Sequence, residues 1–171
     1  MRHAESCLAV VRLLNARSKY AVDWDPQVLG DDMLLALREL ADLESVETEL
    51  PLVLHELQRV DLIRSHPDPN SQFGIIGPAD DFFWKTDPLF QAWHPRRDAR
   101  ELCARALASD SPLTFRAVDE ELAWGPRRLN PAVAFMKAHN LVDDMGAMMD
   151  HPYLVHSARP TVEARFFLEE P

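Results

Sequence analysis

Apolar residues recur every three to four positions in three stretches of the first half of the chain. The first stretch, residues 4–16, carries Ala4, Cys7, Leu8, Val11 and Leu14. The second follows Asp31 or Asp32, either of which can cap a helix, and carries Met33, Leu34, Ala36, Leu37 and Leu40. The third follows Thr48, another candidate cap, and carries Val53, Leu54, Leu57 and Val60. This spacing puts the apolar side chains on one helix face, so it predicts three amphipathic helices.

A cluster of turn-forming residues interrupts this spacing after Leu62-Ile63. It runs from Ser65 to Ser71 and includes Pro67 and Pro69, and short apolar runs follow at residues 73–76 and 82–84. Prolines, asparagines and serines gathered beside apolar runs are typical of turns between strands. The sequence therefore predicts a small hairpin, or wing, after the third helix.

The same order of patterns returns in the second half of the chain. The apolar stripe there consists of Ala99, Leu102, Cys103, Ala106 and Leu107, and Thr114 can cap a following helix that buries Phe115, Val118 and Leu122. Asn130 is placed to cap a third helix, with Pro131 at its first position, where proline is favoured. Residues 161–168 alternate apolar and polar side chains after a turn at 157–160, which predicts a two-stranded hairpin that includes residues 153–156.

These two sets of patterns predict a duplicated unit. The third helices of the two sets end in Leu62-Ile63 and in Leu141-Val142, and each is followed by an expected hairpin. The expected fold is mainly α with small β-hairpin wings (α+β), in two domains that span residues 1–90 and 91–171.

Composition and charge narrow the functional classes. The chain has 171 residues and a formal net charge of −10, so it repels a polyanion at long range unless its basic residues share one face. Cys7 and Cys103 lie in helical patterns without a C-x-x-C spacing, which favours a reducing compartment over a disulfide framework. The apolar run at residues 7–11 is short and ends at Arg12, so we expect no signal peptide or membrane span and a cytoplasmic, soluble protein.

Three helices followed by a hairpin, with a leucine-rich third helix that ends in Leu62-Ile63 or Leu141-Val142, resemble the winged-helix branch of the helix-turn-helix superfamily. The resemblance covers both halves and rests on pattern, without a signature of invariant residues. It implies that the third helix enters the major groove of DNA while the wing contacts the backbone or the minor groove. Winged helices also serve as protein-docking modules.

The resemblance places a candidate DNA-binding surface in the second half. Arg127 and Arg128 would contact phosphates, Asn130 and Lys137 would reach into the groove, and Arg159 would lie at the wing tip. The competing interpretation pairs Arg127 and Arg128 with the nearby Glu120 and Glu121 on the surface.

The first half offers acidic and aromatic candidates for a partner interface. Residues 1–90 hold 8 lysines and arginines against 16 aspartates and glutamates, whereas residues 91–171 hold 10 against 12. The acidic candidates are Glu47, Glu49, Glu56 and Asp61, which would dock a basic protein or simply keep the chain soluble. The aromatic candidates are Phe83, Trp84, Phe90 and Trp93, which would form a partner or dimer surface, or else the core between two small domains.

Enzymatic and cofactor-dependent functions find little support in the residue spacing. His151 and His156 have acidic neighbours but match no known ligand spacing, no G-x-S-x-G frames a serine, and residues 74–77 are too short for a phosphate-binding loop. We therefore expect no metal and no cofactor. The leading hypothesis is a non-enzymatic transcription regulator that binds double-stranded DNA through its second unit. The alternative is an acidic adaptor or inhibitor, including a nucleic-acid mimic, that docks a basic protein and leaves DNA unbound.

Overall fold

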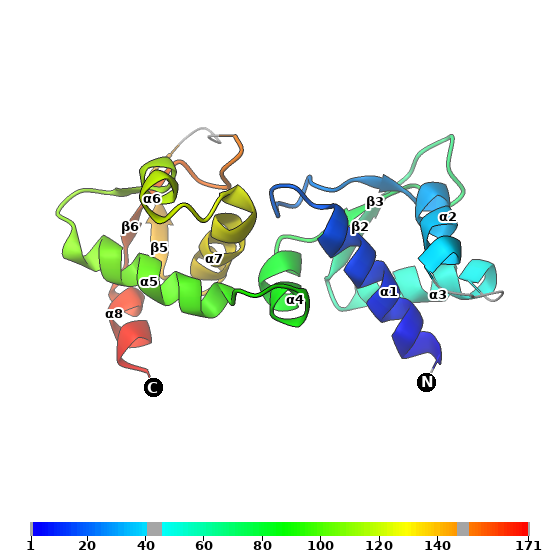
Figure 1. Cartoon of the computed structure of the whole chain (residues 1–171), viewed down its shortest axis with the longest axis horizontal. Helices are drawn as coiled ribbons and strands as arrows, with labels where there is room; N and C mark the ends of the chain where they lie inside the picture. The colour runs from blue at the N-terminus through cyan, green and yellow to red at the C-terminus, as the bar shows by residue number, and fades with distance from the viewer. Residues whose placement is uncertain (1, 41–45, 147–150, 171) are drawn as a thin grey trace. The chain divides into compact units, whose positions relative to one another are not determined.

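The computed structural model of the chain describes residues 2–40, 46–146 and 151–170. It divides into two compact units, Met1–Thr86 and Asp87–Pro171, and the division falls inside one helix, α4 (Phe82–Phe90). Within the described ranges, the fold is mixed α+β, with eight helices and two small three-stranded antiparallel sheets (Figure 1). None of the helices in these ranges has the length and apolar character that a bilayer crossing requires.

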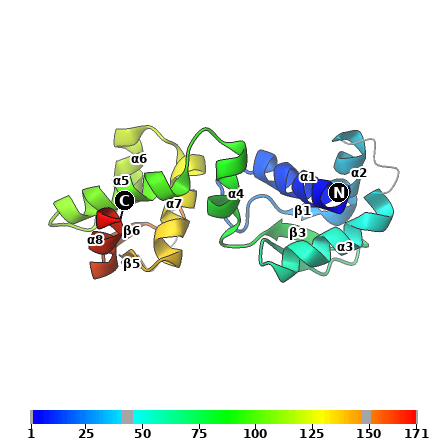
Figure 2. The ribbon, with the colours of Figure 1, turned by 90° about the horizontal axis from the view of Figure 1, so that it is seen from below.

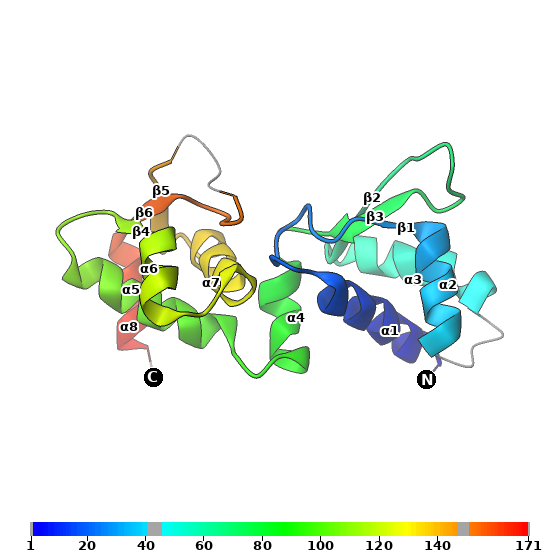
Figure 3. The same ribbon diagram turned by 45° about the horizontal axis from the view of Figure 1, so that its top comes forward.

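The first unit consists of three helices and a sheet. Its elements, in chain order, are α1 (Arg2–Arg17), β1 (Val28–Leu29), α2 (Gly30–Leu40), α3 (Val46–Arg59), β2 (Ile63–His66) and β3 (Ile75–Pro78). The sheet has the order β1-β3-β2, with Val28 opposite Ile76 and Ile63 opposite Pro78. The turn between β2 and β3 extends well beyond the strands (Figure 3). The helices pack their apolar faces together, and the core includes Val10, Leu14, Met33, Leu37, Leu50, Val53, Leu57 and Ile76.

The second unit has the same order of elements with one helix added at its end. They are α5 (Pro95–Ala108), β4 (Leu113–Thr114), α6 (Phe115–Leu122), α7 (Pro126–Ala138), β5 (Val142–Asp144), β6 (Ser157–Pro160) and α8 (Val162–Glu169). The sheet order is β4-β6-β5, with Leu113 opposite Ala158 and Asp143 opposite Arg159. Helix α8 packs beside α5 (Figure 2). The core includes Leu102, Cys103, Phe115, Leu129, Val133, Met136 and Ala164.

The two units therefore share one topology: helix, strand, helix, helix, strand, strand, with the last strand in the middle of the sheet. The three predicted helices are present in each unit, and two antiparallel strands follow the third helix, although they are formed by other residues than predicted. The sequence pattern did not reveal β1 and β4, because strands of two residues are too short to show an alternation.

The apolar run at residues 82–84 was expected in a strand, and this expectation is wrong. The run begins α4, in which Phe82 and Phe83 are buried and the Thr86 hydroxyl donates to the Phe82 carbonyl one turn earlier, at 2.8 Å. A short apolar run fits either a buried strand or a buried helix, and only its neighbours decide between them. The hairpin lies instead between Ile63–His66 and Ile75–Pro78.

The final hairpin expected from residues 153–156 and 161–168 is also wrong. Residues 157–160 form the middle strand of the sheet, and residues 162–169 form α8. Thr161 stands at the N-cap of α8, and Ala164 and Phe167 are buried three residues apart, which is a helical spacing. Val162 and Phe166, which the alternation had grouped with Ala164, are exposed.

The start of the third helix in the second unit differs from expectation as well. Helix α7 begins at Pro126, so Asn130 lies inside the helix and does not cap it. Gly125 precedes it with a φ of 74°, a backbone conformation that glycine adopts without the strain a side chain would add. Pro126 then occupies the first turn, where the missing N–H costs nothing.

Candidate functional site

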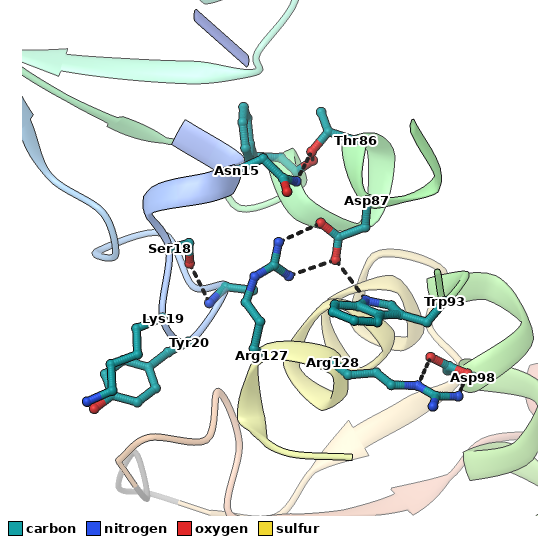
Figure 4. Close-up of polar contacts among 12 residues, drawn as sticks. Asn15, Ser18, Lys19, Tyr20, Thr86, Asp87, Trp93, Asp98, Arg127 and Arg128 are labelled. Carbon is teal, nitrogen blue, oxygen red and sulfur yellow. Dashed lines mark hydrogen bonds and ion pairs between the residues drawn. The ribbon is translucent and has the colours of Figure 1, made fainter. Parts of the chain in front are cut away.

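Arg127, a predicted phosphate contact, lies in a tight ion pair at the start of α7. Its Nη1 and Nη2 atoms donate to the two carboxylate oxygens of Asp87 at 2.8 and 2.9 Å (Figure 4). The Asp87 side chain is 0% exposed and that of Arg127 is 17% exposed. The indole N–H of Trp93 also donates to Asp87, at 3.2 Å, and the Arg127 guanidinium lies 5.7 Å from the centre of the Trp93 ring. Arg127 therefore neutralises a carboxylate that water does not reach.

Arg128 forms a second pair of the same kind. Its Nε and Nη2 atoms donate to Asp98 in α5 at 2.8 and 2.7 Å, and its guanidinium lies 4.1 Å from the centre of the Trp124 ring. The Asp98 side chain is 7% exposed. The hydrogen bonds to Asp98 raise the pKa of Arg128 above its ordinary value, so the guanidinium stays charged at every relevant pH. Two-pronged pairs of this geometry are among the stronger ion pairs in proteins.

Asn130, a predicted groove contact, is fully buried and holds the segment that precedes β6. Its side-chain amide donates to the Pro152 carbonyl at 2.9 Å, and its carbonyl oxygen accepts from the Leu154 N–H at 2.9 Å. Tyr153, between them, donates to Asp119 of α6 at 2.8 Å. Residues 152–154 are thus fastened to both α6 and α7.

Asp119 connects this segment to the turn between α6 and α7. One of its oxygens accepts from Tyr153 and the other accepts from the Gly125 N–H at 2.6 Å. Burial, followed by the hydrogen bond to Asp119, raises the pKa of Tyr153 to about 12. The neutral phenol is therefore the form that the fold favours.

The last two predicted DNA contacts lie away from the start of α7. Lys137 is exposed and its Nζ lies 3.4 Å from a carboxylate oxygen of Asp144 on β5. Arg159 is exposed on β6, opposite Asp143 in the strand register. Arg127, Arg128 and Lys137 are thus each paired with a carboxylate of the same unit, and Arg159 lies opposite Asp143 in the sheet.

The acidic candidates of the first unit lie on or just after α3. Ser6 of α1 donates to Glu49 at 2.8 Å, Glu56 pairs with Arg59 at 2.9 Å, and Asp61 is exposed in the turn after the helix. Glu47 is in α3, but its side chain lies outside the described part of the structure.

The aromatic candidates have different surroundings. Phe83 is 2% exposed and packs edge-on against Phe82, with ring centres 4.9 Å apart, so it belongs to the core and offers no partner surface. Trp84 is half-buried and donates to Asp81 at 3.0 Å. Phe90 is also half-buried, and Trp93 lines a pocket in the second unit.

This pocket has a volume of about 590 Å³ and lies between the α4–α5 connection, α5 and the turn before α7. Its lining includes Trp93, His94, Arg97, Asp98, Trp124 and Arg128. Sequence reasoning missed Asp98 and Trp124. Asp98 carried a usable clue, because it falls on the buried stripe of α5 beside Ala99 and Leu102, where a carboxylate needs a cationic partner.

No group of three or more histidine, cysteine, aspartate or glutamate side chains suited to a metal is found among the residues that the structure describes. The comparisons with protein-family models, with curated proteins and with solved structures found nothing that matches this chain.

Proposed function

We propose that this chain is a non-enzymatic protein-interaction adaptor built from two winged-helix units that do not bind DNA. The winged-helix assignment is supported by the shared order of three helices and three strands, and by a sheet whose last strand lies in the middle. Each unit places its third helix immediately before the two longer strands, where a winged helix carries its recognition helix and wing.

The observation that carries the proposal is the pairing of Arg127 with Asp87. A phosphate could recruit this arginine only by leaving behind a carboxylate that is 0% exposed. Breaking a buried ion pair in this way costs about 3–5 kcal/mol, which exceeds the gain from a single solvent-exposed phosphate contact. The same reasoning applies to Arg128 and Asp98, so neither arginine can leave its carboxylate for a phosphate without this cost.

The overall charge and the exposed apolar residues support protein docking. The formal net charge is −10, which opposes the long-range approach of DNA, and several large apolar side chains lie in solvent. Leu89 is 67% exposed and Phe166 is 63% exposed, both in the second unit. Leu89 follows Pro88, which lines a pocket together with Trp93 and Trp124, and tryptophan is among the residues most enriched at the energetic centres of protein interfaces.

A salt titration of the full chain with a fluorescent random-sequence DNA duplex tests the proposal. We expect no binding at 50 mM salt. The competing DNA-binding function predicts the opposite: an affinity that falls about 10³-fold or more between 50 and 200 mM salt when several phosphates are contacted. Such a steep fall, lost in the exposed-site variant Arg159→Glu, would overturn the proposal.

A parallel measurement addresses docking itself. The wild-type chain and the variant Leu89→Glu are immobilised, and proteins retained from the cells of origin are identified by mass spectrometry. We expect a partner that the wild type retains and the variant loses, since a charge at an exposed apolar anchor disrupts the interface without entering the core. The absence of any such difference, together with a monomeric mass in sedimentation, would count against docking through this surface.

A further inference from the structure

In the pocket beside α5, the carboxylates are paired with arginines, but some of the basic side chains have no partner. Its acidic groups are already paired: Asp98 accepts both bonds from Arg128, and Glu101 pairs with Arg105 at 2.7 Å. Arg97 and His94, in contrast, are exposed, and their side chains have no hydrogen-bonding or ionic partner among the residues that the structure describes. The pocket can therefore take up an anion without first releasing one of its own carboxylates.

Arg128 adds a hydrogen-bond donor, its Nη1 atom, to the side chains of Arg97 and His94. Its Nε and Nη2 atoms are used by Asp98, which leaves the Nη1 atom without a partner in the described ranges. The Arg128 side chain is 31% exposed and lines the pocket. The pair with Asp98 fixes the guanidinium in place, so Nη1 is held ready to donate to a carboxylate or carbonyl oxygen.

Two indole rings provide the apolar part of the same pocket. Trp93 and Trp124 both line it, and each has an arginine over its ring. A volume of about 590 Å³ accommodates one or two side chains of a peptide. Tryptophan and arginine together are the residues most enriched at the energetic centres of protein interfaces.

The apolar surface continues outside the pocket, which favours a protein segment over a small ligand. Pro88 and Ala92 line the rim and are exposed, and Leu89 is exposed between them. A small molecule would fill the pocket and leave this rim in water. A peptide chain crossing the pocket would cover both.

We propose that this pocket binds a partner segment in which an apolar or aromatic side chain stands next to a carboxylate. The apolar side chain lies between Trp93 and Trp124, and the carboxylate accepts from Arg97 and from Nη1 of Arg128. This inference rests on the proposed adaptor function and names the chemistry of its partner. A protein of net charge −10 can bind an acidic group at this pocket, because salt screens distant charges and the nearby Arg97 and Arg128 are positive.

Three capped peptides of ten residues test the inference with the full chain. They share a phenylalanine and glycine-serine flanks, and differ only in the neighbouring residue, which is glutamate, glutamine or lysine. Binding is followed by the NMR shifts of the tryptophan indole N–H groups. We expect the glutamate peptide to bind about two- to fivefold more tightly than the glutamine peptide, as partly exposed ion pairs allow, and the lysine peptide to bind most weakly.

The variant Arg97→Glu gives the sharpest readout. Arg97 is exposed and unpaired in the described structure, so its replacement leaves the fold intact, and we expect the order of the three peptides to reverse. Arg159→Glu changes the net charge by the same amount outside the pocket and should leave the order unchanged. Equal binding of all three peptides, or the same reversal in Arg159→Glu, would overturn this inference. Either result leaves the adaptor function to be judged by the DNA titration.

Discussion

Removing the Arg127 guanidinium should destabilise the second unit strongly. The variant Arg127→Met keeps an apolar chain in place of most of the arginine stem, and it removes the guanidinium near Trp93 with both of its hydrogen bonds to Asp87. Because Asp87 is 0% exposed, its charge then remains in a dry site without this cation. Breaking a buried pair from one side costs about 3–5 kcal/mol, which is a large part of the roughly 5–15 kcal/mol that stabilises a domain.

Urea unfolding followed by circular dichroism and tryptophan fluorescence measures this loss, and a matched control sets its scale. Lys137→Met removes another cation of α7, but from a pair in which both side chains are more than a third exposed. Exposed pairs contribute about 0–1 kcal/mol, so the control should unfold close to the wild type. The double variant Arg127→Met with Asp87→Asn should recover part of the loss, since a neutral side chain then replaces the buried carboxylate.

A clear result would refute this reasoning. If Arg127→Met costs no more than Lys137→Met, the Asp87 carboxylate is hydrated and Arg127 can leave it without penalty. The arginine would then be available for a phosphate, and the main objection to DNA binding at the start of α7 would disappear.

Two further predictions concern single side chains. Cys103 is 0% exposed, and burial raises the pKa of its thiol to about 11. In the native chain, only Cys7 should therefore react with a thiol reagent at pH 8. The variant Cys7→Ser should react only when it unfolds. Reaction of native Cys7→Ser at the wild-type rate would contradict this. The raised pKa of Tyr153 means that its stabilising contribution is present below pH 10 and is lost as the pH rises through about 12. In an ultraviolet titration near 295 nm, Tyr153→Phe should therefore lack the later-ionising phenol, and an unchanged curve would refute the assignment.

The helical part of the fold follows from the sequence because its cause is local. Stripes such as Leu102, Cys103 and Ala106 can be buried only if the chain turns once in 3.6 residues, and the structure has a helix in each place where such a stripe was found. Short segments did not follow in this way. The alternation over residues 161–168 is typical of a strand, but residues 162–169 form a helix, in which Ala164 and Phe167 are buried three residues apart.

The chemistry of Arg127 and Arg128 was decided by tertiary structure alone. Their position before a leucine-rich helix is equally consistent with a phosphate site and with a structural pair, and the partners, Asp87 and Asp98, lie 40 and 30 residues away in the chain. Apolar periodicity in the sequence located six of the helices, α1 to α3 and α5 to α7, and the duplicated order of these elements, because periodicity is a property of neighbouring residues. Folding determined which carboxylate each arginine meets, and it paired Arg127 with Asp87 and Arg128 with Asp98. The physical reason is that electrostatic energy depends on distance and burial in space and not on separation along the chain.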